Sequence, residues 1–379
     1  QIVGGFMEGR KRNPGEFARE VQALGLQIEE YDPRALSEAD WESFFELREQ
    51  RRRGLFPRDP LPSREKERRY MTGAHELWDI HWWRACAAEE SRFVALGGSW
   101  YESNQSPSYD ANRHIVFMDL YVDARYRGQG IGRAYLKALV SQARALGKSL
   151  IRAENAETGS GVPFCHKLGG RVVAERHLNR LYVADVDWDL MAQWRRDGAR
   201  KARGVTLERF RDVPDGDMEQ FCRLYTEVTN QAPAGDLPGE ILVTPEQRRQ
   251  DEKEIRARGY EWHTLVSREP DGTISGLTEM FYAPAEPWHL EQELTGVRAA
   301  YRGRGLGKWL KAEMLGFAAE RYPQAKFVNT GNADHNAPMV SINERMGFRS
   351  ILAQTFFEFT MESLATELGL QSEGSERVP

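Results

Sequence analysis

Two short segments of the sequence repeat one glycine-rich pattern, in which an Arg is followed by Gly three and five positions later. They occupy residues 127–132 and 302–307, 175 positions apart, and each follows a Val and a Tyr at matched offsets. Where a strand turns into a helix, glycines let an anion approach free backbone N–H groups and the positive end of the helix dipole, and an Arg adds a charged donor. Because the pattern occurs twice in matched contexts, we interpret both segments as phosphate-binding turns rather than as purely structural ones.

The spacing of these glycines excludes two common phosphate-binding loops. A dinucleotide-binding loop would have glycine where Arg133 and Lys308 stand. A nucleoside-triphosphate loop has Ser or Thr after Gly-Lys, whereas Trp309 follows Lys308 here. The phosphate expected at these turns therefore belongs to another class of ligand.

The chain is long enough for two domains, because a single hydrophobic core rarely serves more than roughly 100 to 200 residues and the sequence has 379. With one turn in each half, we expect tandem domains at 25–192 and 205–362. A polar, Arg-rich linker is expected at 193–204. An irregular N-terminal arm at 1–24 and a polar C-terminal tail at 363–379 complete this division.

Each half shows strands and helices that would position its turn, because apolar residues at helical spacing follow both glycine patterns. In the first half we expect strands at 24–29, 84–89, 93–101, 114–122 and 149–153, a closing pair of strands at 171–188, and helices at 37–50, 130–146 and 160–168. In the second half we expect strands at 205–210, 261–267, 274–283, 289–297, 325–330 and 350–360, and helices at 217–228, 244–258, after the second turn and at 336–346. The alternation of strands and helices predicts the α/β class, as α+β domains with mixed sheets.

Composition excludes several classes of partner. The net charge of −5 gives no overall attraction to nucleic acid or to an anionic membrane, and no apolar stretch approaches the roughly 18 residues that span a bilayer. Three scattered cysteines provide neither a disulfide framework nor a metal-binding pair. We therefore expect a cytoplasmic protein without a metal, nucleic-acid or membrane partner, and its oligomeric state stays open.

The pattern Arg-x-x-Gly-x-Gly after a strand that ends in Val resembles the acyl-CoA-binding turn of the GNAT superfamily of N-acetyltransferases. The stretch from Asn336-Ala337-Pro338 to Met346-Gly347-Phe348 is similar to that superfamily's Asn-led helix, which ends in Leu-Gly-Phe. The resemblance covers residues 25–190 and 204–362, and the tandem layout is similar to that of mycothiol synthase. It implies two GNAT-like domains, each a twisted mixed sheet flanked by helices.

The resemblance implies a site for acetyl-CoA in a V-shaped gap between the fourth and fifth strands of a domain. The pantetheine would pair with the fourth strand like an added strand, and the pyrophosphate would lie on the turn. In the second half the implied cofactor-binding residues are Thr295, Val297, Arg302, Gly303, Arg304, Gly305, Leu306, Gly307, Lys308 and Asn336. In the first half they are Leu120, Val122, Arg127, Gly128, Gln129, Gly130, Ile131, Gly132 and Arg133, which would bind a second CoA.

The resemblance also implies a general base on the fourth strand, eleven residues before the motif Arg. That position is Glu291 in the second half and Val116 in the first, and Glu293 lies two residues further on, on the same face of the strand. Neighbouring carboxylates raise one another's pKa, so that one of them accepts a proton near neutral pH. We expect Glu291 to be the base with Glu293 beside it; the alternative is that both are solvated or Arg-paired acids.

The superfamily's usual Tyr, which protonates the departing thiolate, is replaced by Asn343 in the second half and by Cys165 in the first. Trp78, Trp82 and Trp83 either line an acceptor pocket or belong to the core, and their spacing favours the core. The acceptor would be bound by segments at about 30–75 and 211–258, whose Arg- and Glu-rich character suggests a polar molecule.

The sequence thus predicts an acetyl-CoA-dependent N-acetyltransferase that acts on a primary amine of a small molecule or peptide by direct attack. The chemistry is expected in the second half, which alone has a carboxylate at the base position. Two alternatives stay open: an active first half with a structural second half, and a CoA-binding regulatory protein without activity.

Overall fold

The computed structural model describes residues 26–87, 92–156, 160–231, 241–333 and 337–370. The expected arm at 1–24 lies outside these ranges, as do Asn336 and the last nine residues of the expected tail. None of the described helices is both long enough and apolar enough to cross a membrane.

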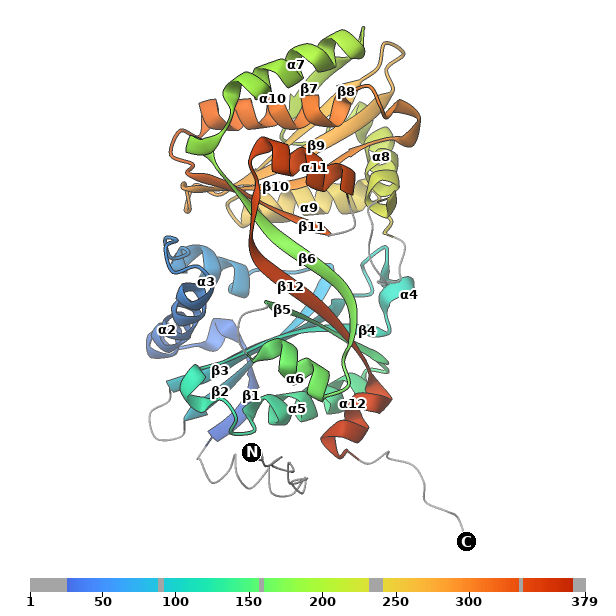
Figure 1. Ribbon diagram of the computed structural model, residues 1–379. Helices are drawn as coiled ribbons and strands as arrows, with labels where there is room; N and C mark the ends of the chain where they lie inside the picture. Colours follow the sequence, from blue (N-terminus) through green and yellow to red (C-terminus); the bar gives the residue numbers. More distant parts are fainter. Residues whose placement is uncertain (1–25, 88–91, 157–159, 232–240, 334–336, 371–379) are drawn as a thin grey trace, which may run out of the picture.

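The described strands form one 12-stranded mixed sheet rather than two separate sheets (Figure 1). Its order is β1-β2-β3-β4-β5-β12-β6-β11-β10-β9-β8-β7. In the first half the strands are β1 (Leu26–Tyr31), β2 (Trp78–Ala87), β3 (Arg92–Glu102), β4 (Ile115–Val122), β5 (Leu150–Ala156) and β6 (Arg171–Tyr182). In the second half they are β7 (Thr206–Phe210), β8 (Glu261–Arg268), β9 (Ile274–Tyr282), β10 (His289–Val297), β11 (Phe327–Ala333) and β12 (Arg349–Thr360). The expected α/β class with mixed sheets flanked by helices is confirmed.

Helices lie against both ends of this sheet (Figure 1). Those of the first half are α2 (Glu38–Leu55), α3 (Arg64–Thr72), α4 (Tyr109–Asn112), α5 (Ile131–Ala145), α6 (Gly161–Lys167) and α7 (Trp188–Lys201). Those of the second half are α8 (Met218–Gln231), α9 (Pro245–Ala257), α10 (Leu306–Arg321), α11 (Ala337–Met346) and α12 (Met361–Leu368). Helices α5 and α10 are the crossovers that parallel pairs require, between β4 and β5 and between β10 and β11.

The two halves exchange their last strands. β6 pairs antiparallel with β11 from Tyr182↔Phe327 to Arg176↔Ala333, and β12 pairs antiparallel with β5 from Thr360↔Leu150 to Gln354↔Ala156. In Figure 1 the two exchanged strands run side by side from one half to the other. The expected pair of closing strands at 171–188 is wrong, because the segment is one long strand followed by a short 3-10 turn and the start of α7.

The helices after the exchanged strands pack on the other half as well. α7 packs on α10, and α12 packs on α5. The expected linker at 193–204 is therefore mostly the body of α7, in which Met191 and Trp194 are buried. Gly198 allows this contact, because a Cβ there would lie 2.5 Å from Cβ of Trp309. The exposed face of this helix is rich in Arg, and for that reason the sequence alone suggested a linker.

The hydrophobic cores consequently differ from the expected division into 25–192 and 205–362. One core joins Leu139 and Ile151 of the first half to Phe357 and Leu364 of the second, and a second core joins Trp194 to Leu310. The expected polar tail at 363–379 is wrong over its first six residues, because Leu364, Ala365 and Leu368 in α12 are buried.

Candidate acyl-CoA site

The two glycine turns have the same backbone conformation. Gly130 and Gly305 immediately precede α5 and α10 with φ of 91° and 81°, a left-handed conformation that favours glycine. Neither helix start has a side-chain cap hydrogen bond, so the first-turn N–H groups face whatever occupies the turn. Both turns therefore have the geometry expected of anion sites.

The motif arginines have a structural task in both turns. Nε of Arg127 donates to the Val122 carbonyl at 3.0 Å, and Nε of Arg302 donates to the Val297 carbonyl at 3.1 Å. Arg302 also donates to Gln231, and Arg304 forms an ion pair with Glu269 at 2.9 Å. These bonds tie each turn to the end of its strand.

In both halves the fourth and fifth strands separate. β4 and β5 are paired only as far as Met118↔Ala153, and β10 and β11 only as far as Glu291↔Asn329. Beyond that point β10 keeps its bonds to β9 on its other side. The expected V-shaped gap is thus present, with a strand edge of β10 along it.

A β-bulge distinguishes the second half from the first. The register of β10 on β9 shifts between Gln292 and Thr295, so that Glu293 and Leu294 together lie opposite Glu279. β4 runs along β3 without such a shift. A bulge redirects side chains and increases local twist, which places Glu293 at the point where the strands part.

A cavity of about 1260 Å³ occupies this gap in the second half. It is lined by most of the residues implied for that half: Glu291, Glu293, Thr295, Val297, Arg302, Gly303, Gly305, Leu306, Gly307 and Lys308. Arg304 turns to Glu269 and does not line it. Asn343, which the sequence analysis placed at the position of the superfamily's Tyr, lines the cavity as well. Sequence reasoning missed several other lining residues: Arg176, Lys201, Lys311, Thr330 and Arg345.

Arg176 and Lys201 reach the cavity only because β6 and α7 cross to the second half, so no local motif points to them. For Lys311, the sequence offered one indication of a role in the site: it is a Lys on an otherwise apolar face of its helix. The wall of the second-half cavity thus includes residues that precede position 205.

In the first half, the corresponding space beside the turn is narrower. A Cβ on Gly132 would lie 3.0 Å from Cζ of Phe164 and 3.6 Å from Cδ2 of Leu120. On Gly307 it would lie 3.8 Å from Cδ1 of Ile342. Arg133 donates to the Glu367 carbonyl of α12 at 2.5 Å. The aromatic ring of α6 and the exchanged helix therefore occupy much of the surroundings of the first turn.

Two carboxylates on β10 differ in their partners. Oε1 of Glu291 lies 2.5 Å from Nε2 of His289. Burial, together with the negative charges of Glu291 and Glu279, raises the pKa of Glu293 to about 7. Glu293 remains accessible from the cavity, so its carboxylate is suited to accept a proton near neutral pH.

A cluster of positive charges lies beside the second turn. Burial, followed by the charges of Arg345 and Lys201, lowers the pKa of Lys308 from its usual value. Nζ of Lys308 lies 5.5 Å from the ring of Trp194, and Arg345 lies 5.2 Å from the same ring. Three cations that repel one another favour a polyanion between them.

Two buried polar side chains also line the cavity. Asn343 is 2% exposed, and neither its Oδ1 nor its Nδ2 has a hydrogen-bond partner among the described residues. Lys311 is 1% exposed, and burial lowers its pKa to about 7. Nζ of Lys311 lies 5.6 Å from the ring of Phe348. Unpartnered buried polar groups destabilise a fold, and the unpartnered amide of Asn343 leaves hydrogen-bonding positions open at this wall of the cavity.

Lys311→Met is expected to stabilise the protein, because Met fills a similar volume without a charge. The folded-state pKa of Lys311 lies below the unfolded value, so its penalty is fully present below pH 7 and disappears as the pH rises towards 10.5. The gain in the free energy of unfolding should reach roughly 5 kcal/mol at pH 7 and shrink above it. Urea denaturation of both proteins between pH 6.5 and 10 measures this; a gain independent of pH would contradict it.

The second half thus combines a glycine turn at a helix start, a splayed parallel strand pair and a bulged strand with a carboxylate, and the first two features agree with the resemblance to the GNAT superfamily. Comparison of the sequence with family models agrees. The acetyltransferase (GNAT) family model matches residues 38–169 and 231–348. The chain therefore belongs to the GNAT acetyltransferase family, as a tandem member with two copies of the domain, and is an acyltransferase.

Solved structures with the same fold are distant in sequence. A tandem GNAT protein from the clavulanic acid biosynthesis pathway superposes with a TM-score of 0.69 at 18% identity, over 89% of this chain and 98% of that one. A GCN5-related N-acetyltransferase from Sphaerobacter thermophilus gives 0.63 at 16% identity, over 89% and 96%. No curated protein sequence matches the chain. The resemblance in layout to mycothiol synthase stays a prediction.

Proposed function

We propose that the chain transfers the acetyl group of acetyl-CoA to a primary amine, in the cavity of its second half. The main support for this function is the position of Glu293, which lies in a bulge of β10 where β10 and β11 separate. The pKa of its carboxyl group is about 7. An acyl group bound along β10 would end at this point. The first half lacks that arrangement, because Val116 is buried in the core and Asp119 is bound by Arg51 at 2.5 Å.

The residues around the cavity fit acetyl-CoA. The second turn and the cations Lys201, Lys308 and Arg345 would hold its phosphates, and the free edge of β10 near Thr295 and Val297 would hold the pantetheine. The orphaned amide of Asn343 offers hydrogen bonds that a ligand in the gap would complete. Acetyl-CoA, when bound, supplies an acetyl group activated as a thioester.

The chemistry required of the protein is modest. Glu293, directly or through water, accepts the proton that the amine loses as its nitrogen bonds to the acetyl carbonyl carbon and the carbon–sulfur bond breaks. Backbone N–H groups of β10 would polarise the carbonyl. Asn343 occupies the position of the superfamily's Tyr, and its Nδ2 would donate a hydrogen bond to the departing thiolate. The sequence-based choice of Glu291 as the base stays a prediction; we favour Glu293 because Glu291 is bound to His289.

The test of this function is release of CoA from acetyl-CoA in the presence of a panel of primary amines, followed with a thiol reagent. Amine-dependent release supports the proposal. Tight binding of CoA in calorimetry without release from any amine would instead favour a regulatory CoA-binding protein, and an absence of CoA binding would contradict both.

Lys308→Ala is expected to weaken CoA binding about tenfold, because it removes one cation from the cluster beside the second turn. Arg133→Ala, the same position in the first turn, is the matched control and should change the dissociation constant less than twofold, since Arg133 is bound to the Glu367 carbonyl. Titration calorimetry with CoA measures both. An equal increase of the dissociation constant in the two variants would contradict the assignment of the CoA site to the second half. The second CoA that we expected in the first half would appear in the titration as an additional binding site.

A further inference from the structure

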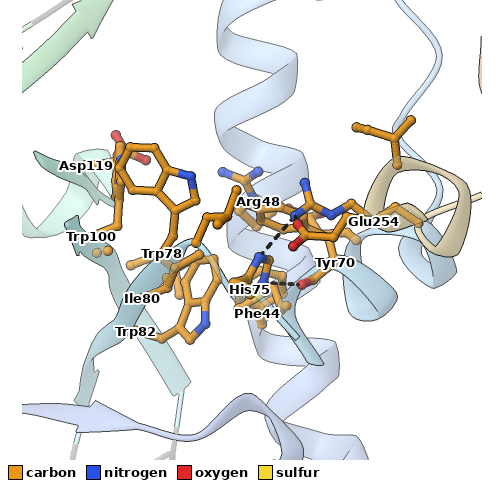
Figure 2. Close-up of a pocket in the computed structure, with 18 of the residues that line it drawn as sticks. Phe44, Arg48, Tyr70, His75, Trp78, Ile80, Trp82, Trp100, Asp119 and Glu254 are labelled. Carbon is orange, nitrogen blue, oxygen red and sulfur yellow. Dashed lines mark hydrogen bonds and ion pairs between the residues drawn. The ribbon is translucent and has the colours of Figure 1, made fainter. Parts of the chain in front are cut away.

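A second cavity, of about 470 Å³, lies between the two halves and is not used by the acyl-CoA site. Eight aromatic side chains from both halves line it: Tyr31, Phe44, Tyr70, Trp78, Trp82, Trp100, Trp262 and Phe281. Figure 2 shows Trp78, Trp82 and Trp100 gathered on one side of this cavity, with Tyr70, His75 and Arg48 on the other. Its volume is that of a typical small-molecule site.

This aromatic cavity adjoins the acyl-CoA cavity on the same face of the sheet. Phe281 on β9 lies directly opposite Glu291 on β10, and Trp262 on β8 lies directly opposite Phe281. Residues opposite one another in antiparallel strands point to the same face, with Cβ atoms about 5 Å apart. Phe281 lines the aromatic cavity and Glu291 lines the acyl-CoA cavity, while Asp251 of α9 lines both.

Most charged groups around the aromatic cavity are paired with one another. Arg48 binds Glu67 at 2.6 Å, Arg51 binds Asp119 at 2.5 Å, and Arg258 binds Glu254 at 2.9 Å. Arg48, Arg51, Glu67, Glu254 and Arg258 belong to the Arg- and Glu-rich segments in which we expected a polar acceptor. Because their charges are mutually satisfied, the aromatic faces remain as the main binding surface.

Asp251 is the exception among these charged groups. It has no cationic partner within 4 Å among the described residues. Burial, followed by the charge of Glu254, raises its pKa to about 6, against the smaller opposing effect of the more distant Arg248 and Arg258. A cation in direct contact with Asp251 would stabilise its charged form more than these arginines do. The carboxylate at the junction of the two cavities thus marks where an ammonium group would be stabilised.

We propose that the aromatic cavity holds the body of the acceptor, a primary amine carried by an aromatic group, whose amino end passes Asp251 towards Glu293. This inference rests on the proposed function and adds the substrate class and a site shared by both halves. Polyamines and aminoglycosides fit less well, because their many polar groups would lose hydrogen bonds to water against an aromatic wall.

The experiment compares 2-phenylethylamine, n-butylamine and spermidine as acceptors and as ligands. We expect kcat/KM to be at least tenfold higher for 2-phenylethylamine than for n-butylamine, since a ring in an apolar pocket gives discrimination of that order. Trp78→Ala should raise its KM about tenfold and leave the KM for acetyl-CoA unchanged. Trp188→Ala, an exposed tryptophan that lines neither cavity, is the control and should change nothing.

A second variant, Ile80→Trp, tests the same cavity in case Trp78→Ala does not fold. Ile80→Trp fills the aromatic cavity from β2 and should abolish calorimetric binding of 2-phenylethylamine while CoA still binds. Equal kcat/KM for all three amines, or an unchanged KM in Trp78→Ala, would overturn this inference and leave the acetyltransferase function standing. Binding of 2-phenylethylamine that Ile80→Trp blocks, without acetylation of any amine, would overturn the proposed function and the acceptor role with it.

Discussion

Glu293→Gln is expected to lower kcat for amine acetylation by about 10²- to 10³-fold, with the dissociation constant of CoA unchanged. The amide keeps the size and shape of the side chain but does not accept a proton, and a positioned general base contributes a factor of this order. In the wild-type protein, kcat/KM should fall as the pH drops through about 7, where Glu293 takes up a proton. Steady-state kinetics from pH 5.5 to 9 measure both effects.

Glu291→Gln is the matched comparison two residues away on the same strand. The charge of Glu291 raises the pKa of Glu293, so its removal should move the acidic limb of the pH profile to lower pH and leave most of the activity. A loss in Glu291→Gln as large as that in Glu293→Gln, with the pH profile unmoved, would instead make Glu291 the base, as the sequence alone suggested.

Phe357→Ala is expected to destabilise the protein by about 3 to 5 kcal/mol, the usual range for removing a fully buried ring. Phe357 belongs by sequence to the second half, but its ring lies in the core under α5 with Leu139 and Ile151. Its loss should therefore open the first half. Hydrogen exchange of amides in α5 locates the effect, and denaturant unfolding gives its size.

Phe356→Ala is the control for this substitution. Its side chain is half-buried on the other face of the same strand, near Arg176, and about 1 kcal/mol or less is expected. Faster exchange confined to α10 in Phe357→Ala, with α5 unchanged, would contradict the exchange of strands between the halves.

The local sequence pattern was sufficient to predict most helices and strands and both glycine turns. Glycines at positions with positive φ, a Val-ended strand before them and an amphipathic helix after them are all encoded within about 25 residues, and the structure places both turns at helix starts. The capping box at the start of α2 likewise joins residues that are close in sequence, Ser37 and Asp40. Such features depend on neighbours in sequence.

The preference for one half could be foreseen in part. Position 291 holds a carboxylate and position 116 a Val, and that difference is visible in the sequence. The bulge that redirects Glu293 is not, because it depends on how β10 pairs with β9 across Glu279. The elevated pKa of Glu293 follows from that geometry and from the burial around it.

By itself, the sequence determined that this protein has two copies of one domain, each with a glycine turn before a helix, because short-range propensity and glycine spacing decide these features; its resemblance to the GNAT family is confirmed by the family model. Only the tertiary structure decided how the halves share strands. The sequences of β6 and β12 each predict a strand but do not name its partner strand. Which pairing forms depends on contacts between residues as distant as Tyr182 and Phe327, and the same long-range packing builds the aromatic cavity and brings Arg176 and Lys201 to the acyl-CoA site.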